Sequence, residues 1–292
     1  MLTRLMMTDT LVTNDRPYAP EGRTGPPGWF AHLVQFSPDH YGWKDGRLVF
    51  HGAPGNTGAN PSTGFAAFLV RNLYATHNSS GAIRRALGPL VNDLALDESK
   101  VGLNFGAGGG GRLHPRILNL DVQDQAHVDL VTDGGDIPLK DASLDLIVTQ
   151  EVLEHVADYR GTVRDLARIL KPGGIIYCQL PFQIGFHPGP NDYRRFSRQG
   201  MEQLFEGPEW HIEQVGVATG HGTAFYRIAV EFCAVTMSAL HRSLYRPAKG
   251  LSAVLLYPFK LFDGLTERSS ERDRIAGGYY AVARRTDAAP SA

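Results

Sequence analysis

The chain has 292 residues, enough to bury one sizeable core with room for accessory segments. Hydrophobic residues make up 42% and charged residues 20% of the sequence, as is ordinary for a globular enzyme. The formal net charge of −1 gives no basic footprint, so we expect no nucleic-acid partner. Two cysteines, Cys178 and Cys233, exclude a disulfide framework and a cysteine zinc site, and Cys178 is expected to be a small core residue.

The first 80 residues are rich in Pro, Gly, Asn, Ser and Thr. We predict that residues 1–80 form an irregular N-terminal region or lid against the rest of the chain. Within it, residues 41–50 surround a Lys-Asp-Gly turn and predict a small hairpin. Residues 1–13 lack the apolar segment of a signal peptide, and we see no uncharged apolar run of about 18 residues, so we expect no transmembrane segment. The expected compartment is the cytoplasm.

The next elements predict a ligand site at the end of two strands. Helical periodicity runs from Ile83 to Leu96. An apolar strand then ends in a glycine-rich loop that contains Gly106 and Gly108, and a second strand ends at Asp121. Glycines let a ligand approach the backbone, and a carboxylate accepts hydrogen bonds from two sugar hydroxyls. This layout is typical of a nucleoside-cofactor site at the carboxyl edge of a parallel sheet.

A dinucleotide is one candidate for this site, because Gly106, Gly108 and Gly111 satisfy the pattern G-x-G-x-x-G. A pyrophosphate needs the amino end of a helix that begins inside the glycines, and Pro115 would end or distort that helix. Asp121 also follows the first glycine by fewer than the usual 20 or so residues. An NAD(P)-dependent oxidoreductase is therefore the alternative, and a cofactor without phosphates is favoured.

Further motifs follow in a fixed order. They are a polar turn D-G-G-D-I-P at 133–138, an apolar strand at 144–149, E-V-L-E-H-V at 151–156, a helix stop L-K-P-G-G at 170–174, and a strand at 175–181. Together with the glycine loop, this order resembles the class I S-adenosylmethionine-dependent methyltransferases, type 11-like, over about residues 100–221 and again at 278–283. The resemblance implies a Rossmann-like α/β domain over residues 81–292. Its seven-stranded sheet would be mostly parallel, with an antiparallel last strand and helices on both faces.

The resemblance also implies S-adenosylmethionine as cofactor. Glycine-loop backbone would pass beneath its methionine and ribose, Asp121 would bind the ribose hydroxyls, Asp133 would accept from the adenine amino group, and Gln150 would face the methionine. The cofactor-binding residues expected in this way are Asn104, Gly106, Ala107, Gly108, Asp121, Asp133, Gly134 and Gln150.

One position departs from the family pattern. The family usually has an acidic residue where this chain has Asn104, and asparagine forms hydrogen bonds but carries no negative charge. Either the affinity for the positively charged cofactor is lower, or Glu151 supplies the missing charge. A non-catalytic S-adenosylmethionine-binding module is therefore a further alternative.

A metal site is suggested by the segment at 151–156. On a helix, Glu151, Glu154 and His155 would share one face. The arrangement E-x-x-E-H with a later His187 resembles small-RNA 2′-O-methyltransferases and ubiquinone-pathway O-methyltransferases, in which a divalent metal holds the acceptor hydroxyls. The implied ligands of a Mg²⁺ ion are Glu151, Glu154, His155 and His187; the alternative is a set of polar side chains that line a pocket without metal.

The loop after the fifth strand contains the most distinctive sequence motif of the chain. Residues 181–196 match P-F-x-x-x-x-H-x-x-P-x-D-Y-x-R-F, which resembles a methyltransferase subgroup often associated with bacterial surface-sugar and natural-product pathways. His187 is the expected general base, because its ordinary pKa of about 6.5 suits proton removal near neutrality. The other expected acceptor-site residues are His155, Asp192, Tyr193 and Arg194. The alternative is an Asp192–Arg195 pair that only fixes the loop.

The C-terminal third holds an apolar helix pattern at 222–242 and an apolar insertion at 243–276 before the last strand. The insertion is interpreted as a helix on the domain, a pocket lid or an oligomer contact. Its basic flanks also suit an interfacial helix in peripheral contact with a membrane, although Pro258 interrupts the pattern. The sequence therefore predicts a methyltransferase that most closely fits O-methylation of a small-molecule or glycan hydroxyl.

Overall fold

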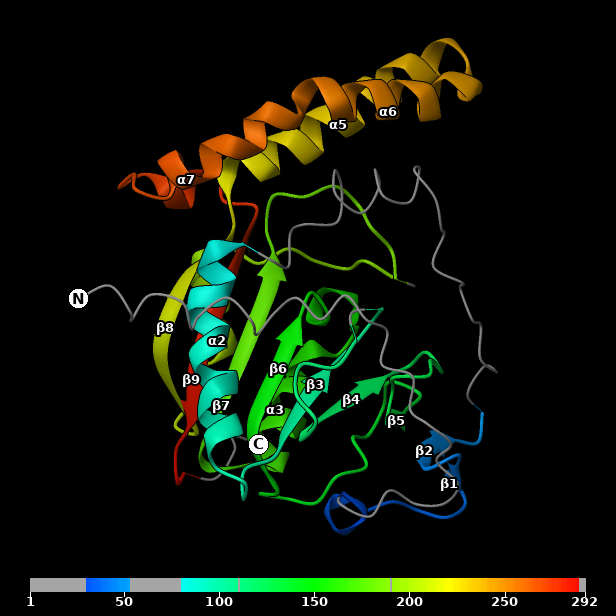
Figure 1. Ribbon diagram of the computed structural model, residues 1–292, viewed down its shortest axis with the longest axis vertical. Helices are drawn as coiled ribbons and strands as arrows, with labels where there is room; N and C mark the ends of the chain where they lie inside the picture. Colours follow the sequence, from blue (N-terminus) through cyan, green and yellow to red (C-terminus); the bar gives the residue numbers. More distant parts are fainter. Residues whose placement is uncertain (1–29, 53–79, 110, 190, 289–292) are drawn as a thin grey trace, which may run out of the picture.

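The computed structural model describes residues 30–52, 80–109, 111–189 and 191–288 (Figure 1). Most of the predicted N-terminal lid, at 1–29 and 53–79, lies outside the described residues. Figure 1 shows one central sheet with helices packed on it, and a separate pair of long helices beyond the ends of the central strands.

The sheet has nine strands in the order β1-β2-β5-β4-β3-β6-β7-β9-β8. The strands are β1 (Tyr41–Lys44), β2 (Arg47–Phe50), β3 (Gly102–Phe105), β4 (Ile117–Asp121), β5 (Leu130–Val131), β6 (Leu144–Gln150), β7 (Leu170–Pro181), β8 (Trp210–Thr219) and β9 (Gly278–Arg285). The strands from β2 to β7 pair in parallel, and β9 is antiparallel to both β7 and β8. The predicted sheet with an antiparallel last strand is confirmed, and two N-terminal strands extend it.

Those two added strands form the hairpin predicted at residues 41–50. Asp45 (φ 50°) and Gly46 (φ 73°) both have positive φ, as a two-residue turn of a twisted hairpin requires. Leu48 then pairs in parallel with Leu130, so β2 joins the edge of the sheet at β5. A short 3₁₀ helix, η1 (Ala31–Leu33), precedes the hairpin.

Helices cover both faces of the sheet, as predicted. On one face, α2 (Gly81–Leu96) begins at Ser80, whose hydroxyl accepts from the Ile83 amide at 3.1 Å, and its apolar side packs on Tyr177 and Tyr280. On the other face lie α3 (Tyr159–Ile169) and α4 (Arg198–Leu204). Cys178, between these layers, is fully buried, and burial raises the pKa of its thiol well above the usual range. It is a core residue, as expected.

The segment after β6 differs from the predicted helix. Glu151 has a positive φ of 56°, which a right-handed helix does not allow, and only a single 3₁₀ turn, η3 (Leu153–His155), follows. The helix α3 starts later, where the Asp158 carboxylate accepts from the Gly161 amide at 2.9 Å. The expectation that one helix face carries the acidic and histidine side chains was therefore wrong.

The connection between β8 and β9 is a helical arm. It contains α5 (His221–Leu240), η4 (Arg242–Leu244), α6 (Tyr245–Leu256), η5 (Tyr257–Phe262), α7 (Asp263–Thr266) and η6 (Arg272–Arg274). In Figure 1, α5 and α6 run side by side beyond the carboxyl ends of the central strands. Within the described part of the chain, α5 alone is long and apolar enough to cross a membrane, a test that core helices also pass; Arg227 and Glu231 interrupt it.

Candidate active site

The glycine loop follows β3 in the sequence and packs against the turn after β6. Gly106 has φ +74°, and a Cβ atom at this position would collide with the Val152 side chain. Gly108 also has a positive φ, of 53°, but a Cβ there would meet no described neighbour within 4 Å. The loop is therefore packed on the Val152 side and open above Gly108, where a ligand can approach the backbone.

Asp121 ends β4 directly beside this loop. One carboxylate oxygen accepts from the Gly108 amide at 2.7 Å, and the other accepts from the Gln123 amide at 2.9 Å. An ionised carboxylate offers about four lone pairs, so two remain for further donors. The side chain is thus fixed by the loop and still able to accept hydrogen bonds from two hydroxyls.

Asn104 is linked to the glycine loop by hydrogen bonds through Asn119. Its Nδ2 donates to Asn119 Oδ1 at 3.1 Å, and Asn119 Nδ2 donates to the carbonyls of Gly111 at 3.1 Å and His127 at 3.0 Å. The His127 ring also contacts the Gly108 carbonyl at 2.6 Å. Sequence reasoning missed Asn119 and His127, although the paired L-N-F and L-N-L strands place the two asparagines opposite each other.

The remaining predicted cofactor residues lie on the same edge. Asp133 and Gly134 form an exposed turn after β5, where Asp133 Oδ1 accepts from the Gly135 amide at 2.9 Å. Gln150, at the end of β6, donates to Oε1 of Gln179 at 3.1 Å, and Gln179 is fully buried. Gln179 was not singled out from the sequence because its role depends on the pairing of β6 with β7.

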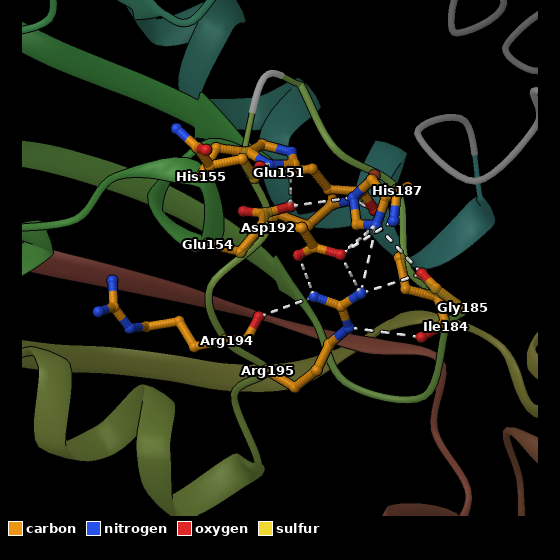
Figure 2. Close-up of polar contacts among 11 residues, drawn as sticks. Glu151, Glu154, His155, Ile184, Gly185, His187, Asp192, Arg194 and Arg195 are labelled. Carbon is orange, nitrogen blue, oxygen red and sulfur yellow. Dashed lines mark hydrogen bonds and ion pairs between the residues drawn. The ribbon is translucent and has the colours of Figure 1, made fainter.

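The acceptor side of this edge carries a cluster of Glu154, His155 and His187 (Figure 2). One ligand atom from each of the three residues lies within 4.8 Å of the others. Glu154 is fully buried, and its Oε1 is 3.6 Å from His155 Nε2 and 3.5 Å from His187 Nε2. Within the part of the chain that the structure describes, neither Glu154 oxygen has a hydrogen-bond partner, and neither does His187 Nε2. A buried carboxylate without a donor is costly, so this site needs a cation or a proton.

Both imidazole rings are oriented by backbone carbonyls. His155 Nδ1 contacts the Asn191 carbonyl, and His187 Nδ1 lies 3.2 Å from the Gly185 carbonyl. A carbonyl only accepts, so Nδ1 of each ring carries the hydrogen and each Nε2 lone pair faces Glu154 when the ring is neutral. Histidine ligands of metal ions show this same arrangement.

Charge on Glu154 also affects the chemistry of His187. The Glu154 carboxylate raises the pKa of the His187 imidazole, against the lowering by burial, with further help from the Gly185 carbonyl and Asp192. Glu151 lies outside the cluster of three, and Gln179 Nε2 donates to its Oε1 at 3.4 Å. Its positive φ marks it as a strained residue at the edge of the site.

Asp192 and Arg195 hold the acceptor loop in place. Arg195 donates to both Asp192 oxygens, with Nη2 at 2.7 Å from Oδ2, and the His187 amide donates to the same oxygen at 2.9 Å. These hydrogen bonds keep the pKa of the Asp192 carboxyl well below its usual range despite burial, and those from Arg195 contribute most. Asp192 therefore positions His187 through the loop backbone.

The other two predicted acceptor residues lie apart from the cluster. Tyr193 is half exposed, and its amide donates to the Glu154 carbonyl at 2.9 Å. Figure 2 shows Arg194 extending away from His187; its guanidinium donates to the Ala157 carbonyl at 3.1 Å and lies over the Tyr159 ring. Thus the structure brings together His155, His187 and Asp192, but not Arg194.

The chain is similar to known methyltransferases. A family model described as a methyltransferase domain matches residues 113–178. A probable S-adenosylmethionine-dependent methyltransferase of Mycolicibacterium smegmatis is 29% identical over 141 residues, which cover 45% of this chain and 52% of the relative. A probable enzyme of the same class from Mycobacterium tuberculosis is 41% identical over 55 residues, covering 19% of this chain and 20% of the relative. The chain thus spans about half the length, or less, of these relatives.

Among solved structures, a putative sarcosine dimethylglycine methyltransferase from Galdieria sulphuraria aligns with a TM-score of 0.42 and 15% identity. The alignment covers 70% of this chain and 88% of that one. The ordered motifs, the sheet with its antiparallel last strand and the matched relatives agree with one another. Residues 113–178 therefore match a methyltransferase domain, and the chain is similar to S-adenosylmethionine-dependent methyltransferases.

Proposed function

We propose that this protein transfers a methyl group from S-adenosylmethionine to a hydroxyl of a small-molecule or glycan acceptor. The observation that carries the proposal is the buried Glu154 carboxylate between two imidazole Nε2 atoms. The turn that presents it also contacts the glycine loop, because Val152 packs against Gly106. A group suited to activating a hydroxyl therefore adjoins a loop suited to a nucleoside cofactor.

The cofactor side fits S-adenosylmethionine, which supplies an electrophilic methyl group when bound. The two free lone-pair positions of Asp121 suit the ribose hydroxyls, and the open side of Gly108 leaves room beside them. Across residues 106–109 and 111–116, the described chain forms turns and no helix. This weighs against a dinucleotide, whose pyrophosphate needs a helix amino end.

On the acceptor side, His187 Nε2 accepts the hydroxyl proton, and Glu154 stabilises the imidazolium that results. The Asp192–Arg195 pair and the Gly185 carbonyl hold the ring in the required orientation. This assignment gives His187 the role of general base and Asp192 a positioning role.

The same three side chains also fit a divalent metal, since two imidazole nitrogens and one carboxylate form a common ligand set. Glu154, His155 and His187 would hold the ion, which would lower the pKa of a bound hydroxyl. In that case His187 Nε2 is a ligand and not a base, so the two assignments exclude each other.

Calorimetric titration tests the cofactor assignment first. S-adenosylhomocysteine and S-adenosylmethionine should bind and NADH should not, in Mg²⁺ and in chelator alike. Tighter binding of NADH would reject the family's cofactor for this site. Transfer of labelled methyl to a panel of sugars and hydroxylated natural products then tests the acceptor class; transfer confined to amines would overturn O-methylation. Loss of transfer in chelator, restored by Mg²⁺, would select the metal over the base.

A further inference from the structure

The helical arm, defined here as residues 221–266, carries most of the large apolar side chains that are exposed in the described part of the chain. Fourteen of the nineteen large apolar side chains that are exposed among the described residues lie on it. Phe232 is 70% exposed, Leu255 66% and Leu261 75%. Many large apolar side chains exposed on one element indicate an interaction site.

The exposed apolar side chains lie on helix faces that do not take part in the contact between α5 and α6. In α5, Phe225, Ile228, Phe232 and Val235 are exposed at spacings of three and four, so they share one face of the helix. The contact between α5 and α6 is made by a different set, which includes Tyr226, Val230 and Ala253. The α6 helix likewise leaves Leu251, Val254 and Leu255 outside that contact. Both helices therefore present apolar faces that nothing in the described chain covers.

The charge on the arm selects the kind of partner. The arm holds five basic side chains, Arg227, Arg242, Arg246, Lys249 and Lys260, against two acidic side chains, Glu231 and Asp263, which gives 5 − 2 = +3. The whole chain has a net charge of −1, so the positive charge is concentrated here. Glu231 is already paired with Lys249, whereas Arg242 and Arg246 are exposed where α5 turns into α6.

We propose that the helical arm docks on an anionic lipid surface. Its exposed apolar side chains would enter the head-group boundary, while Arg242 and Arg246 contact lipid phosphates with their stems lying along the apolar region. A second copy of the chain is a poorer partner, because pairing two arms would bring two charges of +3 together. This inference does not depend on the proposed reaction.

Co-sedimentation of the full chain with vesicles tests the proposal. Binding is expected with phosphatidylcholine that contains phosphatidylglycerol, weak binding with phosphatidylcholine alone, and weaker binding as salt rises. The double variant Arg242→Glu with Arg246→Glu should lower partitioning at least tenfold, because each basic side chain near such a surface contributes on the order of fivefold. The control Lys44→Glu with Arg160→Glu makes the same charge change at exposed sites on the catalytic body and should bind normally.

A second double variant tests the apolar faces. Phe232→Ser with Leu255→Ser should lower vesicle binding several-fold without lowering Tm, since both side chains are exposed. If the double variant has a lower Tm and the unmodified protein does not bind vesicles, the protein itself covers the arm, and the proposal is overturned. So would absence of binding to anionic vesicles at low salt, or a dimer by light scattering that this variant dissociates. Binding that resists both salt and carbonate would also overturn it, because the arm would then span the bilayer.

Discussion

Two buried carboxylates at the carboxyl edge of the sheet, Asp121 and Glu154, have opposite surroundings. Each Asp121 oxygen already accepts a backbone N–H, so the charge is stable before any ligand arrives. Among the described residues, neither Glu154 oxygen has a hydrogen-bond donor, and two imidazole Nε2 atoms lie 3.5 and 3.6 Å from Oε1. The hydrogen bonds of Asp121, on the proposed cofactor side, are therefore supplied by the backbone, while Glu154, on the proposed acceptor side, is left for a cation or a proton to complete.

The largest effect on activity should come from a substitution on the acceptor side alone. Glu154→Gln keeps the volume of the side chain but removes the charge that supports an imidazolium or a metal ion. We expect kcat to fall by about a hundredfold or more, the range of a lost acid–base group, with unchanged affinity for S-adenosylhomocysteine. Steady-state kinetics and calorimetry check this, with Glu151→Gln as control. Undiminished turnover would remove Glu154 from the mechanism.

A substitution on the cofactor side should have a smaller effect, and it should lower the affinity for the cofactor rather than kcat. Asp121→Asn brings an amide group to the Gly108 N–H and removes a charged acceptor. We expect affinity for S-adenosylhomocysteine to fall by about tenfold to a hundredfold, as for a lost hydrogen bond to a charged group, with little change in kcat at saturation. The exposed Asp133→Asn serves as control and should lose less. Equal losses in both variants would contradict the role given to Asp121.

The pH profile sharpens the comparison. Glu154 and Asp192 raise the pKa of His187, while burial lowers it and Arg195 lies close to the same ring. In the metal-free protein, the His187 imidazole should titrate above its ordinary value of about 6.5. If His187 is the base, kcat/KM rises with pH through that raised pKa, whereas the stability from the protonated ring is lost over the same range. NMR titration should show the pKa moving down in Glu154→Gln; no movement would contradict the coupling.

The smallest effect is expected from the loop that positions His187. Asp192→Asn weakens the bonds to Arg195 and to the His187 amide and should lower stability by about 1–3 kcal/mol. Because the folded pKa of Asp192 lies below its unfolded value of about 3.9, this stability is present above that pH and is lost as pH falls through the folded pKa. Denaturant unfolding at neutral and acidic pH should show the wild-type advantage shrink in acid. A constant difference would argue against the ion pair.

The sequence predicted those features that depend on local pattern. The strands β3, β4, β6, β7 and β9 are apolar runs bounded by turns, and the hairpin follows from its Lys-Asp-Gly turn. The helix at residue 151 was wrong because spacing alone does not reveal the positive φ of Glu151 or the later start at Asp158. Glu154 and His155 were named from a helix face that does not exist, and a single 3₁₀ turn places them in the cluster instead; His187 was named from the loop after the fifth strand.

Other features depend on which strands pair, and the sequence carries that information only weakly. The Asn104–Asn119 and Gln150–Gln179 contacts arise from the parallel register of neighbouring strands. The joining of β2 to β5 is equally non-local. The choice between an acceptor-binding Asp192 and a loop-fixing Asp192–Arg195 pair needed the distances between side chains.

The helical arm leaves and re-enters the sheet at a single point. Thr219, at the end of β8, lies opposite Gly278, at the start of β9, and the Gly277 amide donates to the Thr219 carbonyl at 2.8 Å. The two strands would be joined equally well by a tight turn, so the arm imposes no register on them. The length of this insertion can therefore change without altering the register of β8 against β9.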